Sequence, residues 1–191
     1  MGKVFTSFGN MSRAYNKARG ELIRFGVLWD GSKLDEVECL YEPLELNGLR
    51  GWMGFYQYND KNIHFPAVYN GLDWSLEWTD KNSAIDVLRH EFAHALAHRY
   101  PKALRNGDLF KKAFGGPYGD RAARGTSPDD WEGRCVSGYA ATATQEDFAE
   151  TFMFYLKHKG KIPAKFAKKP AIRKKWKAVA KIIRRIAVSD R

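Results

Sequence analysis

The chain has 191 residues, 44% of them hydrophobic and 14% aromatic, and carries a net charge of +10. This composition is typical of one globular domain and excludes a disordered chain, and two cysteines are too few for a disulfide-based scaffold. No apolar run approaches the roughly 20 residues of a membrane-spanning helix, and the N-terminus lacks the apolar stretch of a secretory signal, so we expect a cytoplasmic protein with no membrane span.

The N-terminal part of the chain predicts one helix followed by strands. Residues 11–27 have a partial apolar face at helical spacing, and residues 37–46 are strand-like. Aromatic and β-branched residues at 52–58 and 63–69 flank a polar turn-forming segment, which predicts a hairpin. Because Pro66 cannot donate to a strand ladder, we expect residues 63–69 to form an edge strand.

The rest of the chain predicts helices separated by one long loop. The strongest helix spans residues 83–99, where Ser83 and Asp86 resemble a capping box and Pro101 prevents continuation. Residues 105–143 are rich in glycine and predict an irregular loop, which inside a compact domain is usually functional. Two further helices are expected at residues 144–158 and 170–188. The predicted fold class is α+β, with a small mixed sheet preceding the helices.

The helix at 83–99 contains the motif His90-Glu91-Phe92-Ala93-His94. His90 and His94 stand one turn apart on one face, and two neutral imidazoles so spaced suit a tetrahedral zinc ion. Glu91, offset by one position, can reach a water beside the metal without binding the metal itself. The motif also occurs by chance on amphipathic helices, so it does not establish a zinc site by itself. A catalytic zinc needs a third protein ligand and an open coordination position.

Several residues are candidates for that third ligand. His98 lies one turn beyond His94, but three ligands along one straight helix surround a tetrahedral ion poorly. We therefore interpret His98 as a supporting or surface histidine. Glu146 and Glu150 lie one turn apart on the following helix, opposite an aromatic face. Taken alone, these two carboxylates fit a solvated acidic face equally well.

A longer segment favours the metal interpretation. Tyr139 precedes Glu146 by seven residues, and Glu146 is followed by Phe148-Ala149-Glu150. Together with the HExxH motif, this pattern resembles the catalytic domain of anthrax lethal factor and its relatives, which include the small Pro-Pro endopeptidases. The resemblance covers residues 83–158, and nothing in the chain corresponds to the delivery and docking domains of lethal factor.

The resemblance implies a zincin-like zinc endopeptidase acting on a protein or peptide. It implies His90, His94 and Glu146 as zinc ligands, Glu91 as general base, Tyr139 as the phenol facing the developing oxyanion, and Glu150 as a residue that orients a ligand histidine. An extended substrate would pair along the predicted edge strand at residues 63–69.

The C-terminal segment differs from the rest in charge. Residues 157–191 contain 14 Lys and Arg and one acid, Asp190, so the first 156 residues carry a net charge of −3. We expect a metallopeptidase domain at residues 1–160 and a docked basic helix within 161–191, whose outer face is solvated, paired with the acidic body, or an anchor for nucleic acid. Two alternatives remain: a DNA-associated metalloprotease, or a nucleic-acid-binding protein with a structural or vestigial metal site. We also expect deletion of residues 170–191 to abolish DNA binding at low salt and, provided that the protein remains folded, to leave peptide cleavage largely intact.

Overall fold

The computed structural model describes residues 3–6, 8–43, 54–69, 74–79, 84–104, 108–120 and 131–189, and the structural statements below concern these residues. The strands are β1 (Lys3–Thr6), β2 (Cys39–Pro43), β3 (Phe55–Tyr56), β4 (Ile63–Tyr69) and β5 (Trp74–Thr79). The helices are α1 (Phe8–Arg24), α3 (Ala84–Arg99), α4 (Pro101–Leu104), α5 (Asp108–Phe114), α6 (Thr144–Lys157), α7 (Ala164–Ala167) and α8 (Pro170–Ser189), with a 3-10 turn η3 (Tyr139–Ala141). The fold is a mixed α+β arrangement, as predicted.

The five strands form one mixed sheet in the order β1-β5-β4-β2, with β3 pairing with β4. β2 runs parallel to β4, whereas β3 and β5 run antiparallel to it. The predicted hairpin is confirmed by the β3–β4 pair, although β3 has only two residues. The segments around it at 44–53 and 70–73 lie outside the described residues.

The prediction that residues 63–69 form an edge strand is wrong. β2 pairs along one side of β4, while β3 and β5 pair at its two ends along the other side. Ile63 donates its N–H toward the β2 side, to Glu38, so alternation along the strand directs position 66 toward the opposite side. Pro66 therefore sits between the residues that pair with β3 and those that pair with β5, where its missing N–H breaks no ladder.

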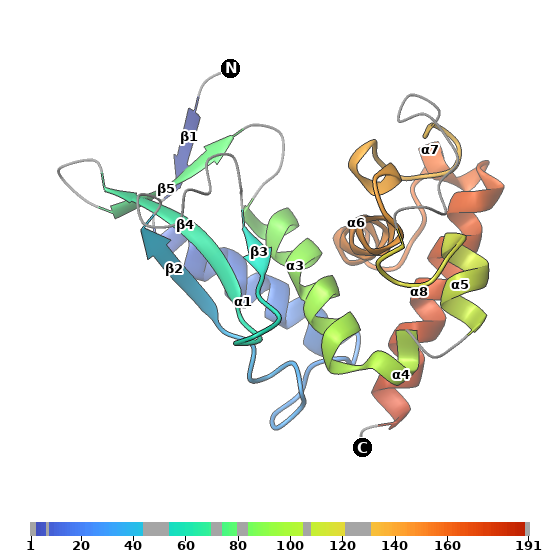
Figure 1. Cartoon of the computed structure of the whole chain (residues 1–191), viewed down its shortest axis with the longest axis horizontal. Helices are drawn as coiled ribbons and strands as arrows, with labels where there is room; N and C mark the ends of the chain where they lie inside the picture. The colour runs from blue at the N-terminus through green and yellow to red at the C-terminus, as the bar shows by residue number, and fades with distance from the viewer. Residues whose placement is uncertain are drawn as a thin grey trace.

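Helix α3 is the centre of the molecule. Figure 1 shows the sheet and α1 on one side of α3, and α5, α6 and α8 on the other. All residues from Asp86 to Ala97 are buried, so the helix contacts protein around its whole circumference. The face that carries His90 and His94 packs against α6, and the other side of the helix packs against α1, β3 and β4.

The C-terminal helix α8 belongs to the same hydrophobic core as α1, α3 and α6. Its predicted inner face is buried, and Trp176 donates from Nε1 to the Gly160 carbonyl at 2.9 Å. The buried residues of this face are Ile172, Trp176, Val179, Ile183 and Ile186. Among the described residues, no helix has the length and apolar character needed to cross a bilayer.

A buried ionic cluster fixes the start of α3. The Arg89 guanidinium donates to both carboxylate oxygens of Glu21 on α1, at 2.6 and 2.7 Å, and to Asp86 at 2.5 Å. Asp86 also accepts from Lys157 at the end of α6, at 2.6 Å. Asp86 thus pairs with cations, while Ser83, its predicted capping partner, lies outside the described residues. The cluster ties α1, α3 and α6 together beside His90.

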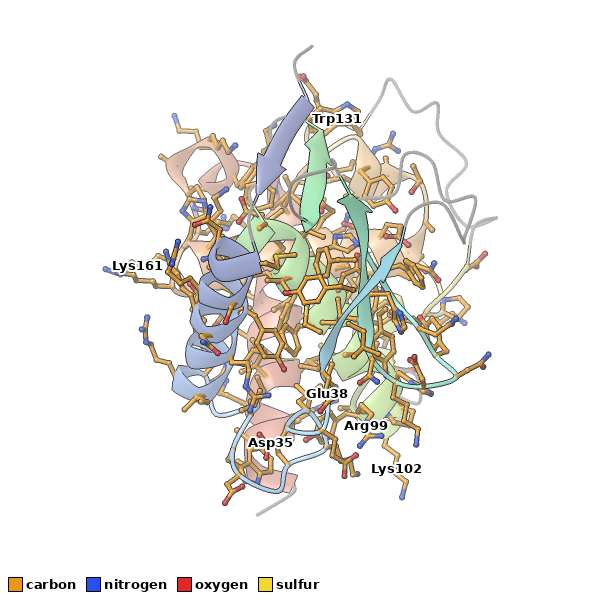
Figure 2. The ribbon with its side chains drawn as sticks, turned by 90° about the vertical axis from the view of Figure 1, so that its left-hand side faces the viewer. Asp35, Glu38, Arg99, Lys102, Trp131 and Lys161 are labelled. Atoms are coloured by element: carbon orange, nitrogen blue, oxygen red, sulfur yellow. The ribbon has the colours of Figure 1, made fainter. Side chains whose placement is uncertain are left out.

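The other end of α3 is held by the loop that follows α1. Arg99 donates from Nε to the Lys33 carbonyl at 2.8 Å and pairs with Glu36. Figure 2, which views the sheet side, shows Arg99 close to Glu38 and Asp35 at one end of the molecule. Both ends of the helix that carries the HExxH motif are therefore fixed by polar contacts to the N-terminal segment.

Candidate metal centre

Two histidines of α3 direct their Nε2 atoms at one point. His90 and His94 are each 8% exposed, and their Nε2 atoms lie 3.1 Å apart. One helical turn separates the two residues, which places the rings side by side with their centroids 4.9 Å apart. The local geometry thus follows directly from their i, i+4 spacing.

Glu146, in the first turn of α6, completes a triangle with these two atoms. Its Oε2 lies 3.1 Å from Nε2 of His90 and 3.4 Å from Nε2 of His94. Zinc binds such atoms at about 2.0–2.2 Å with tetrahedral angles, which puts its ligand atoms about 3.3–3.6 Å apart. The three residues are buried and their ligand atoms are mutually close, so this cluster has the size that a zinc ion requires.

The outer nitrogens of both imidazoles have partners. Nδ1 of His90 lies 2.9 Å from Oε1 of Glu150, and Nδ1 of His94 lies 2.8 Å from the Tyr118 hydroxyl. A carboxylate at Nδ1 of His90 keeps the ring proton on that nitrogen and leaves Nε2 with its lone pair. With the ring protons on the outer nitrogens, Nε2 of both histidines and Oε2 of Glu146 can all offer lone pairs to one cation.

The pKa shifts of Glu146 and His90 also favour a positive charge between them. Burial alone would raise the pKa of Glu146, but its hydrogen bonds with His90 and His94 and their charges outweigh burial and hold the pKa well below its ordinary value. Burial likewise disfavours a charged His90, yet Glu146, Glu150 and the charge of Glu91 raise its pKa. The surrounding carboxylates thus favour positive charge at the centre of the triangle, which a divalent ion supplies.

Glu91 occupies a separate position beside the triangle. It is 6% exposed, and its Oε2 accepts the backbone N–H of Tyr56 in β3 at 2.8 Å. Burial raises the pKa of Glu91, and the nearby Glu146 adds to that effect, while His90 and His94 oppose it. A buried carboxyl group with a raised pKa is suited to accept and return a proton near neutral pH.

Tyr139 approaches the cluster from the turn η3. Its ring centroid lies 5.7 Å from that of His90, and its hydroxyl is near enough to Glu146 to feel that carboxylate. Burial and the charges of Glu146 and Glu91 raise the pKa of Tyr139, so the phenol keeps its proton at neutral pH and can act as a donor. The residue as a whole is 56% exposed, which leaves one side of its ring open to solvent.

Ser137 connects this turn to the histidine partners. Its Oγ donates to Oε2 of Glu150 at 2.6 Å and accepts the N–H of Ala140 at 3.1 Å. His98, in contrast, lies outside the triangle. Its Nδ1 lies 2.9 Å from the Tyr56 hydroxyl, and its ring packs edge-on against Tyr58 with centroids 5.1 Å apart.

Sequence reasoning missed three of these contacts. Ser137 lies two residues before Tyr139 and could have been noticed from that proximity. Tyr118 comes from the glycine-rich stretch after α5, which has no periodicity that would relate it to α3. Tyr56 acts through its backbone N–H, which no side-chain pattern reveals.

Comparisons with known proteins agree with this geometry. The family described as "Putative zinc-binding metallo-peptidase" has a model that matches residues 81–182, just over half of the chain. The matched stretch includes α3, the turn η3, α6 and most of α8. Searches among curated proteins and among solved structures gave no match.

Proposed function

The chain belongs to this family of zinc-binding metallopeptidases, and on that premise we propose that it is a zinc-dependent endopeptidase. In this proposal His90, His94 and Glu146 hold the metal. The observation that carries it is the buried triangle of two Nε2 atoms and one carboxylate oxygen, with mutual distances of 3.1, 3.1 and 3.4 Å. Three ligands from the protein leave a fourth position for water and substrate.

The proposed chemistry is hydrolysis of a peptide bond. Zinc bound in the triangle would polarise the scissile carbonyl and lower the pKa of a water molecule to about 7. Glu91 would accept the proton of the attacking water and later deliver it to the leaving amine. The hydrogen bond from the Tyr56 N–H fixes one oxygen of Glu91, which keeps the carboxylate oriented during this transfer.

Tyr139 would stabilise the negative charge that develops on the carbonyl oxygen. Its raised pKa keeps the phenol protonated, and a preorganised O–H donor strengthens as charge builds on the acceptor. In this proposal the phenol points to the substrate carbonyl from the exposed turn η3, beside Glu146 and His90.

We assign the molecule to the zincin-like, lethal factor-like group on the same grounds. The seven-residue spacing from Tyr139 to Glu146 brings both residues to His90, and Glu150 lies on the other side of that ring. A sheet precedes the HExxH helix, and its strand β3 touches the proposed base. We also propose that residues 1–160 form the peptidase unit, with the helix in 161–191 packed onto it.

The substrate would bind along β3 rather than along β4. Among the described residues β3 pairs with β4 alone, and the N–H of Tyr56 on its other side is occupied by Glu91. An extended peptide could lie beside β3 and donate its own N–H groups to the outward carbonyls of this strand. This places its scissile bond next to the proposed base.

The test compares three histidines of one helix. Purified wild-type protein should contain about one zinc per chain, and His90→Ala/His94→Ala should lose it, because two of three ligands are gone. His98→Ala, the matched control one turn further on, should retain zinc because His98 bonds to Tyr56 instead. Zinc in the double variant at the wild-type level would refute the site.

Activity is tested separately with an unfolded protein such as casein. Glu91→Gln should keep zinc, since Glu91 is not one of the three ligand residues, and should lose cleavage because an amide cannot accept the proton. Undiminished cleavage by a zinc-loaded Glu91→Gln protein would exclude the proposed mechanism.

A further inference from the structure

Helix α8 carries all its exposed charge on one face. At 100° per residue, six basic residues fall within an arc of about 120°, opposite the buried face. We call this set the basic face of α8. Its members are Arg173, Lys174, Lys177, Lys181, Arg184 and Arg185, all of them exposed.

These charges do not hold the helix in place. The helix docks through its apolar residues and through Lys175, which is only 8% exposed in its side chain and pairs with Asp147 at 2.5 Å. Other cations with a structural role are also paired, as Lys157 is with Asp86 at 2.6 Å. Within the described part of the chain, no carboxylate forms an ion pair with any member of the basic face.

The arrangement is unfavourable for an isolated protein. Arg173, Lys177, Lys181 and Arg185 follow one another at i, i+4 spacing, and like charges so placed destabilise a helix. The first turn of α8 contains no acidic residue to complement the helix dipole. An anionic partner would remove this repulsion.

We propose that the basic face of α8 binds the phosphate backbone of double-stranded DNA, independently of base sequence. From Arg173 to Arg185 the face is about 18 Å long, and a duplex presents one phosphate charge about every 1.7 Å along its axis. A straight row of cations can therefore contact several phosphates at once. This binding function is additional to the proposed peptidase, whose residues lie on α3, α6 and η3.

The apolar side chains of α8 argue against two other partners. Single-stranded nucleic acid is bound through aromatic side chains that stack on bases, and membranes require apolar residues that insert beside the cations. The one aromatic residue of α8, Trp176, is 6% exposed and donates to Gly160 within the protein. Ile172 and Ile183 are buried as well, and among the described residues of α8 the one large apolar side chain that is exposed is Val188, near the end of the helix. A single valine is a weak membrane anchor, so the basic face offers mainly phosphate contacts.

The experiment measures binding of a labelled 24-base-pair DNA duplex by fluorescence anisotropy between 50 and 200 mM KCl. With three to five phosphates neutralised, the logarithm of the binding constant should fall with the logarithm of salt at a slope of about −3 to −5. Lys177→Glu/Lys181→Glu should reduce the magnitude of the slope by about 2 and weaken binding at least tenfold.

Arg13→Glu/Lys17→Glu is the matched control. These exposed residues of α1 have the same i, i+4 spacing, and the substitutions change the net charge by the same amount. Figure 1 shows α1 behind the sheet, away from the middle of α8. The control should bind DNA within about twofold of wild type. Melting temperatures verify that both variants are folded.

Other outcomes overturn the proposal. An equal loss in both double variants would mean that only net charge matters. Absence of duplex binding by the wild type at 50 mM KCl would refute the face as a binding surface. Tighter binding to single-stranded DNA, or to vesicles of anionic phosphatidylserine, would reject duplex DNA as its partner.

Discussion

Ser137 links two parts of the candidate site that are otherwise separate. One of its contacts reaches Glu150, the partner of His90, and the other caps the turn that carries Tyr139. A shift of His90 is thus transmitted to Tyr139 through a single hydroxyl group. The orientation of a ligand and the position of the proposed oxyanion donor are set together.

The hydroxyl group of Tyr139 should affect the rate of cleavage and leave zinc binding unchanged. Tyr139→Phe should lower kcat by roughly 10²–10³, the usual cost of one oxyanion donor. Zinc content and melting temperature should stay at wild-type values, because the residue is 56% exposed and its ring is retained. If kcat is unchanged in a fully zinc-loaded variant, the hydroxyl has no role in the reaction.

The two glutamates of α6 should differ in their effect on zinc affinity. Glu146→Ala removes an atom of the triangle and should cost most of the affinity, whereas Glu150→Ala removes only the partner of His90 Nδ1 and should cost about 10–100-fold. Competition titration with a chelating dye measures both. The opposite ranking would place Glu150 in the ligand set.

The three residues that could hold a metal were predictable from sequence because two of their contacts follow helical periodicity. His90 and His94 meet through i, i+4 spacing, and Glu146 follows from the family spacing to Tyr139. Helical spacing alone did not show which of Glu146 and Glu150 lies at the Nε2 atoms of the histidines. The crossing of α6 over α3 separates them, because it places one carboxylate at Nε2 and the other at Nδ1 of His90.

At the scale of elements, Lys175 connects α8 to the site. Its ammonium pairs with Asp147, next to Glu146, and donates to the Arg134 carbonyl in the segment leading to η3, at 2.6 Å. Both groups are buried, with side-chain exposures of 8% for Lys175 and 1% for Asp147. The C-terminal helix therefore contacts both the first turn of α6 and the segment that precedes Tyr139.

This contact predicts a large effect on stability. Lys175→Met should lower the free energy of unfolding by about 3–5 kcal/mol, because it leaves the Asp147 carboxylate buried without its cation. Urea denaturation followed by circular dichroism measures the change. Lys177→Met, two residues away on the exposed basic face, serves as the control and should change stability by about 0.5 kcal/mol or less. Similar effects for the two variants would show that the Lys175 pair contributes no more than a surface charge.

The long helices and the strand β4 were predictable, whereas three short elements were not. Apolar periodicity located α1, α3, α6 and α8 to within three residues at each end. β1, β5 and α5 have four, six and seven residues, too few for a period to stand out from its surroundings. The edge assignment of β4 failed because Pro66 lies where an interior strand has a gap in pairing, which only the strand order reveals.

At the scale of the molecule, the packing of α8 bears on the condition under which it can be removed, namely that the shortened protein remains folded. Deletion of residues 170–191 would expose Leu104 and Phe110 of the shared core and leave Asp147 without its cation. We expect the truncated protein to lose cooperative thermal unfolding and peptide cleavage together. A truncated protein that cleaves peptides at the wild-type rate would contradict this prediction, and the charge substitutions on α8 are the appropriate way to test DNA binding.

The Arg89 cluster has a consequence for how the sequence can vary. The family match begins at residue 81, yet the Arg89 guanidinium, next to His90, is paired with Glu21, which lies 60 positions before that boundary. A substitution at either position alone leaves a buried charge uncompensated. Among relatives, positions 21 and 89 should therefore change in concert, so that α1 is inherited together with the matched segment and is not freely exchanged for another N-terminal sequence.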